Sequence, residues 1–170
     1  MSAGFVAYTE LVGKLLADFQ ALELLLRSYL YGRSDGRHAP LSQSLNDLVR
    51  GQQVPENALT DWNTLSQLIE RYNRLVQPIG PEQVVDPAIV TLRDALAHGR
   101  VWLHDRESVL ILRFDKPVKG VVTVAFSQVA SEEWLKERLR HVAEQITPVV
   151  KAGRAAGLAP NIFGSRQVTK

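Results

Sequence analysis

Apolar residues recur at steps of three and four positions along most of the chain, and this spacing predicts amphipathic helices. Four long helices are expected over residues 5–31, 58–77, 86–98 and from Ser131 to about residue 150, with a short helix over 41–50. Trp62 falls on the apolar face of the second helix. Asp86 suits the N-cap of the third helix, Pro87 its first position and Gly99 the position after its last turn.

A different pattern follows the third helix. The segments "VWLH", "SVLILRF" and "VVTVAF" are short, rich in β-branched and aromatic residues, and separated by polar or glycine-containing turns. Such runs predict a three-stranded antiparallel meander. The predicted fold class is therefore an all-α bundle of four main helices plus a short one, with a small three-stranded antiparallel β insertion before the last helix.

Composition narrows the class of protein. A chain of 170 residues with 45% hydrophobic residues favours one domain, which we assign to residues 1–150. The absence of cysteine excludes disulfides and thiolate metal sites, and a cytoplasmic location is the default. Charged residues interrupt the apolar run of the first helix, so no membrane span is expected. Residues 151–170 are predicted to be a flexible basic tail, which either contacts phosphates or is simply a solvated end.

The segment "RDALAHG", residues 93–99, carries the candidate chemistry. On a helix, Arg93 and His98 lie about 140° apart and flank a polar strip, while Asp94 lies four residues before His98 and can hold its imidazole. The core is expected to take the remaining face, made of Ala88, Ile89, Leu92, Ala95 and Leu96. His98 could transfer a proton and Arg93 could bind a phosphate, so two copies facing each other could cleave RNA without a metal. Histidine and glycine are also ordinary residues at a helix end, and the pattern alone leaves that interpretation open.

The longer segment "LRDALAHGR", residues 92–100, resembles the signature of the HEPN superfamily, in which an arginine, a polar residue, three variable residues and a histidine follow one another. The first helix, with "FQALELLLRSYLYGR", is similar to the corresponding helix of small stand-alone members. The resemblance implies a HEPN-like helical bundle and a metal-independent endoribonuclease of the toxin or antiphage type. Arg93 and His98 would be its catalytic pair, and Asp94 the polar residue beside them.

The same resemblance implies the partners. Two copies would form a homodimer with a composite cleft for RNA, no cofactor would be needed, and an antitoxin or another partner protein could control the activity. The alternative is a non-catalytic HEPN-like module that binds nucleotide or mediates protein interaction or dimerisation.

Other polar residues give weaker signals. His104 either joins the surface beside the motif or is an exposed strand residue, and His141 either adds to a positive rim with Arg138 and Arg140 or lies on a solvated helical face. His38 has no assigned role. The four histidines are too scattered to predict a metal site, and the tryptophans are expected to be core or interface anchors in preference to base-stacking platforms.

Overall fold

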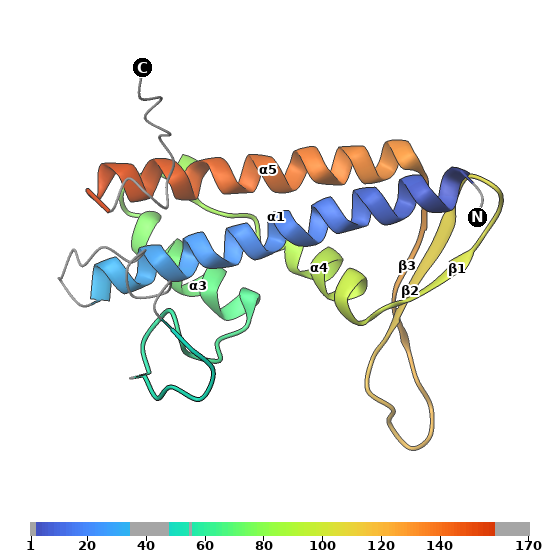
Figure 1. Ribbon diagram of the computed structural model, residues 1–170, viewed down its shortest axis with the longest axis horizontal. Helices are drawn as coiled ribbons and strands as arrows, with labels where there is room; N and C mark the ends of the chain where they lie inside the picture. Colours follow the sequence, from blue (N-terminus) through green and yellow to red (C-terminus); the bar gives the residue numbers. More distant parts are fainter. Residues whose placement is uncertain (1–2, 35–47, 55, 159–170) are drawn as a thin grey trace. The chain divides into compact units, whose positions relative to one another are not determined.

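The structure is a computed structural model that describes residues 3–34, 48–54 and 56–158 (Figure 1). Its elements follow one another as α1 (Ala3–Ser34), α3 (Leu65–Val76), the 3₁₀ helix η1 (Pro81–Gln83), α4 (Ile89–His98), β1 (Arg100–Leu103), β2 (Val109–Phe114), β3 (Val124–Ala130) and α5 (Glu132–Ala155). They group into two compact units. The sheet unit comprises Met1–Gln20 and Ala88–Glu144, and the helical unit comprises Ala21–Pro87 and Gln145–Lys170.

The all-α fold class is wrong, because the described residues form a mixed α/β structure of four α-helices and a three-stranded antiparallel sheet. The predicted meander itself is confirmed, with strand order β1-β2-β3. The sheet is no peripheral insertion, since Val109, Ile111 and Ala130 are buried in the core of the sheet unit. Those strand side chains do the packing that an all-α bundle would assign to another helix.

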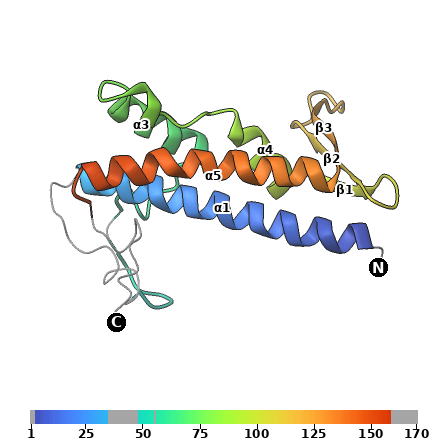
Figure 2. The same cartoon turned by 90° about the horizontal axis from the view of Figure 1, so that it is seen from above.

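The sheet unit is built around the middle strand. Ile111 of β2 pairs with Val101 of β1 on one side and with Gln128 of β3 on the other. The first parts of α1 and α5 lie side by side in this unit and run in the same direction (Figures 1 and 2). Helix α5 begins as predicted, where Ser131 Oγ accepts a hydrogen bond from the Trp134 N–H at 3.2 Å. The helices bury a stripe that includes Leu11, Leu15, Phe19, Leu135 and Val142.

Helix α4 is shorter than predicted. It starts at Ile89 with Ala88 as N-cap, so Asp86 does not cap it, and Ala88 is exposed instead of facing the core. The backbone N–H of Asp86 donates to Gln145 Oε1 at 2.8 Å. Gly99 does follow the last turn, but its φ of −74° is available to any residue. Glycine is required there because a Cβ would collide with the carbonyl oxygens of Ala95 and Leu112.

The helical unit begins its α3 later than predicted. Thr64 and Gln67 form a capping box, which fixes the helix start at Leu65 and leaves residues 58–63 outside the helix. Trp62 therefore lies outside the helix and is 97% exposed, so the prediction that it belongs to an apolar helix face is wrong. Within this unit the rings of Tyr29 and Tyr72 meet edge to face at 5.0 Å, and the Tyr72 hydroxyl donates to the Gln83 carbonyl.

The first helix and the last helix are both longer than predicted. The predicted first helix is confirmed and extended to Ala3–Ser34. Most of the predicted helix 41–50 lies outside the described residues, and its described end, 48–50, is not helical. Helix α5 continues to Ala155, and Ala152 and Leu158 are buried, so a flexible tail does not start at 151. Residues 159–170 of that predicted tail lie outside the described residues.

No helix in the described ranges combines the length and the apolar character needed to cross a membrane.

Candidate functional site

Helix α4 carries the three predicted site residues away from its core-facing side. Ile89, Leu92 and Ala95 are buried, as the helical spacing predicts. The side chains of Arg93 and Asp94 are 31% and 29% exposed, and His98 is exposed at the last position of the helix. The helix therefore presents its guanidinium, carboxylate and imidazole outside the apolar interior.

Asp94 binds arginines instead of the histidine. Its Oδ1 accepts a hydrogen bond from Arg93 Nη1 at 3.0 Å, and its Oδ2 accepts one from Arg113 Nη1 at 3.4 Å. Among the described residues no hydrogen bond joins Asp94 to His98, although the four-residue spacing had suggested one. One carboxylate thus holds two guanidinium groups side by side.

Arg113 is the site residue that sequence reasoning missed. Arg113 follows Val109 and Ile111 at two-residue steps along β2, so its side chain lies on the same face of the sheet. The burial of Val109 and Ile111 shows that this face packs in the core. A basic residue on the buried side of a strand was the signal that could have revealed it, because such a charge needs a partner. Its Nε is buried, and no described residue accepts a hydrogen bond from it. The guanidinium of Arg113 therefore keeps donors that no described residue uses.

His98 has no hydrogen bond or ion pair with another described side chain. The Gly99 N–H that follows it donates to the Ala95 carbonyl at 2.9 Å and closes the helix. Because a Cβ at position 99 would lie only 2.9 Å from the Leu112 carbonyl oxygen, the end of α4 lies close against β2. The exposed imidazole is held at the junction between helix and sheet, where both of its nitrogens remain available to a ligand.

The other histidines do not join this group. His104 is exposed and follows β1, so the whole of that strand separates it from His98. His141 Nδ1 lies 3.9 Å from Glu144 Oε2 on α5. His38 is outside the described residues. Within the described part of the chain, no three or more His, Asp or Glu side chains are arranged to hold a metal ion.

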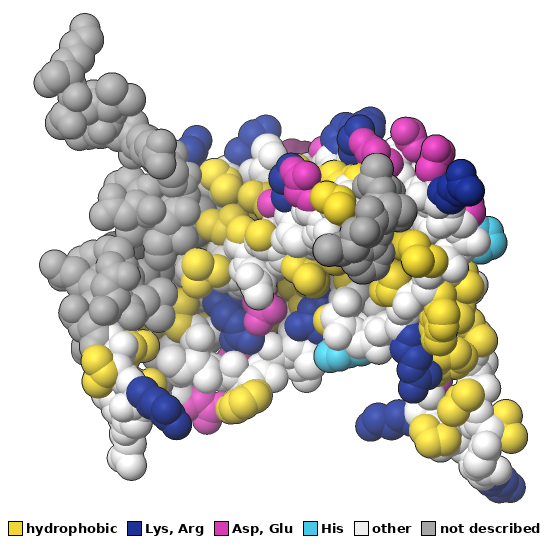
Figure 3. Space-filling view, turned by 45° about the vertical axis from the view of Figure 1, so that its right-hand side comes forward, with side chains coloured by type: hydrophobic (Ala, Val, Ile, Leu, Met, Phe, Trp, Pro, Cys, Tyr) yellow, Lys and Arg dark blue, Asp and Glu magenta, His cyan; other side chains and the backbone are white. Residues whose placement is uncertain are grey.

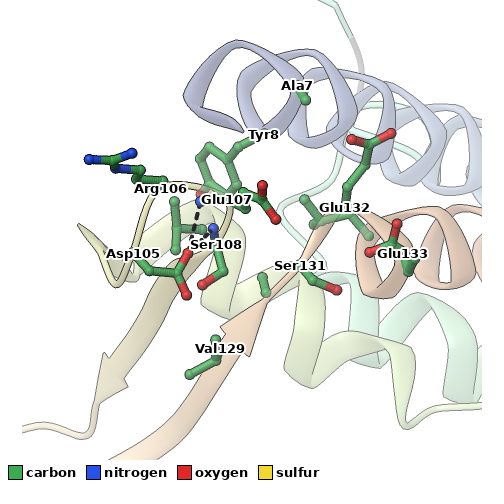
Figure 4. Close-up of a pocket in the computed structure, with 13 residues that line it drawn as sticks. Ala7, Tyr8, Asp105, Arg106, Glu107, Ser108, Val129, Ser131, Glu132 and Glu133 are labelled. Atoms are coloured by element: carbon green, nitrogen blue, oxygen red, sulfur yellow. Dashed lines mark hydrogen bonds between the residues drawn. The ribbon is translucent and has the colours of Figure 1, made fainter. Parts of the chain in front are cut away.

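A cavity of about 850 Å³ lies elsewhere in the sheet unit, between the start of α1, the turn 105–108 and the start of α5 (Figure 4). Its lining includes the carboxylates Asp105, Glu107, Glu132 and Glu133, but none of Arg93, Asp94 and His98. The backbone N–H of Glu107, followed by hydrogen bonds from Ser108, lowers the pKa of Asp105. These acids disfavour a phosphate ligand, so the cavity is not the predicted RNA site.

Comparisons with protein-family models, with curated proteins and with solved structures find no match.

Proposed function

We propose that this protein is a metal-independent endoribonuclease of the HEPN type, with a composite site formed by two copies. The observation that carries the proposal is the position of Arg93 and His98, which α4 keeps out of the core, with His98 at the last position of the helix. The proposal depends on this motif and not on an all-α fold.

The chemistry needs one proton acceptor and one proton donor. One His98 would take the proton of a ribose 2′-OH, whose oxygen then attacks the neighbouring phosphorus. The His98 of the second copy would protonate the departing 5′-oxygen, so the strand breaks and a cyclic phosphate forms. Arg93 would stabilise the negative charge that develops on the phosphate, because a guanidinium donates two parallel hydrogen bonds.

Asp94 has a different role from the one expected. By accepting from Arg93 and Arg113 at once, it would position both guanidinium groups for a phosphate. Asp94 is then a positioning residue, and Arg113 supplies a second cation that offsets the negative charge of the carboxylate.

A ribonuclease acting on cytoplasmic RNA needs control, so we also assign it a toxin or antiphage role and an inhibitory partner protein.

The test is RNA cleavage in EDTA by the full chain and by its His98→Ala and Arg93→Ala variants. Each substitution should lower the cleavage rate about 100-fold or more, since proton transfer and charge stabilisation each contribute at least this much. His104→Ala is the matched control, because it removes an exposed imidazole beyond the far end of β1 and should leave the rate unchanged. Cleavage that survives in both α4 variants would reject the proposal.

A second measurement tests the composite site. Sedimentation should show a dimer, and an excess of the His98→Ala protein should inhibit the unaltered protein, because each mixed dimer has one imidazole only. Undiminished cleavage in the mixture would show that one copy is sufficient.

The non-catalytic alternative also has an observation in its favour. Asp94 is bound to two arginines, which leaves the imidazole of His98 with no carboxylate partner among the described residues. The same cations would then bind the phosphates of a nucleotide without cleaving them. Binding of RNA or nucleotide that depends on Arg93, with no cleavage by the unaltered protein, would favour this module.

A further inference from the structure

One face of the sheet is left partly uncovered by the described residues. Paired residues of antiparallel strands point to the same side, so the register places one set of side chains opposite the buried Val109 and Ile111. This set, here called the open face, consists of Arg100, Trp102, Leu110, Leu112, Phe114, Val124, Ser127 and Val129. Trp102, Val124 and Val129 remain 49%, 52% and 41% exposed. Hydrophobic side chains are accordingly visible along the sheet and its hairpin in Figure 3.

Charge and aromatic character indicate what the open face could bind. Its one charged residue is Arg100, which is exposed and whose Cζ lies 5.1 Å from the centroid of the Phe114 ring. Lys116 and Lys119 are exposed on the hairpin that extends from the same strands. Aromatic rings accept stacked bases of any sequence, and guanidinium and ammonium groups bind the phosphates between them.

We propose that the open face binds single-stranded RNA beside His98, at the junction between the end of α4 and β1. This inference rests on the proposed ribonuclease function and names its substrate class. Arg100 is two residues after His98, so their Cα atoms are at most about 7 Å apart. A strand with a base stacked on the exposed Trp102 and a phosphate on Arg100 would therefore bring its backbone toward the imidazole.

The same chemistry disfavours other occupants. A duplex keeps its bases stacked on one another and presents no free base to the rings. An apolar protein surface would bury the guanidinium of Arg100 without supplying an acceptor. A single strand supplies both unstacked bases and phosphate oxygens.

The experiment measures binding separately from cleavage. The full-length His98→Ala protein is titrated into a labelled single-stranded RNA of about 12 nucleotides, and the dissociation constant is compared with and without Trp102→Ala. We expect binding to weaken about 10-fold, because one stacking platform is lost. Trp62→Ala in the same background is the matched control, since it removes a 97% exposed tryptophan from the helical unit and should leave binding unchanged.

Arg100→Gln tests the phosphate contact. It should reduce the slope of log K against log salt by about 0.7, the value for one phosphate contact on a single strand. A thermal melt of each variant checks folding, and both altered side chains are exposed on an edge strand. An unchanged slope would contradict the assignment of Arg100 to a phosphate.

Three results would overturn the inference: equal binding by the Trp102→Ala and Trp62→Ala proteins, tighter binding of duplex than of single strand, or a dimer that Trp102→Ala dissociates without a change in RNA binding. The last result would assign the open face to a second copy. If RNA binding depends on Trp102 but the unaltered protein does not cleave RNA, the ribonuclease proposal is rejected and RNA binding by the open face stands. If the unaltered protein cleaves RNA but Trp102→Ala does not weaken RNA binding, the ribonuclease proposal stands and the open-face proposal is rejected.

Discussion

Arg27 and Arg93 are both helical arginines paired with an aspartate, but the protein uses them differently. Arg27, in the helical unit, makes six hydrogen bonds to oxygens of Glu23, Ala58, Asp61 and Asn63. Arg93, in the sheet unit, makes one hydrogen bond to the described residues, with Asp94 as the acceptor. The side chain of Arg27 is 12% exposed and that of Arg93 is 31% exposed.

The number of unused donors distinguishes a structural arginine from a binding arginine. A guanidinium has five N–H donors, and around Arg27 the protein itself supplies their acceptors. That network fastens the turn before α3 to α1 within the helical unit. Most N–H donors of Arg93 have no acceptor among the described residues. We therefore assign phosphate binding to Arg93 and not to Arg27.

The largest expected effect on the free energy of unfolding comes from replacing Arg27 by methionine, and the same replacement of Arg93 is the comparison. Arg27→Met should lower the free energy of unfolding by about 3 kcal/mol, because it leaves buried acceptors without donors. Arg93→Met should cost less than about 1 kcal/mol, since its ion pair is partly solvated. Urea denaturation of both variants measures the difference. Equal losses would show that Arg93 is as structural as Arg27 and would undermine the proposed site.

A smaller effect is expected at Gly99, which holds α4 against β2 and thereby keeps Asp94 beside Arg113. Gly99→Ala places a methyl group against the Ala95 and Leu112 carbonyl oxygens and should cost about 2 kcal/mol. The matched control is Gly13→Ala in α1, where a Cβ meets no atom within 4 Å. Removing a glycine from a helix interior should stabilise the protein by about 0.5–1 kcal/mol. A Gly99 variant as stable as the Gly13 variant would mean that the helix is not held as described.

The sequence predicted the structure best in segments where a single spacing of hydrophobic residues dominates. Helical spacing predicted the first helix and the buried side of α4, and short β-branched runs predicted three strands in the correct order. It was least informative where local polar groups decide a boundary. Trp62 fits the apolar pattern of α3, but the capping box at Thr64 starts that helix later and leaves the ring exposed.

The candidate site on α4 could likewise be predicted only as far as residues close in sequence determine it. Which side of α4 is buried follows from the spacing of its own residues, and for Ile89, Leu92 and Ala95 this was predicted correctly. The partner of Asp94 does not, because Arg113 is nineteen residues away and reaches it only through the packing of β2 on α4. A local rule offered His98 four residues on, whereas the fold supplied a stronger cationic donor to the same carboxylate.

The smallest expected effect is on the pH dependence of stability at Asp61, the carboxylate partner of Arg27. Burial alone would raise the pKa of Asp61, but hydrogen bonds from Arg27, Asn63 and Arg71 lower it below its usual value. A carboxylate with a lowered pKa stabilises the folded state fully above its unfolded pKa, about 3.9, and loses that contribution as the pH falls toward the folded pKa. Asp61→Asn should therefore be less stable than the unaltered protein at pH 7, and the difference should shrink below about pH 4.

Urea denaturation between neutral and acid pH measures this difference, and Arg27→Met supplies the comparison. Without the guanidinium of Arg27, the pKa of Asp61 should rise toward its usual value, so the effect of Asp61→Asn in that background should depend less on pH. An Asp61→Asn difference that is constant from neutral to acid pH would show that the carboxylate gains nothing from its charge. Arg27 would then act through its bonds to backbone carbonyls alone, and the contrast with Arg93 would depend on those carbonyls instead of on the ion pair.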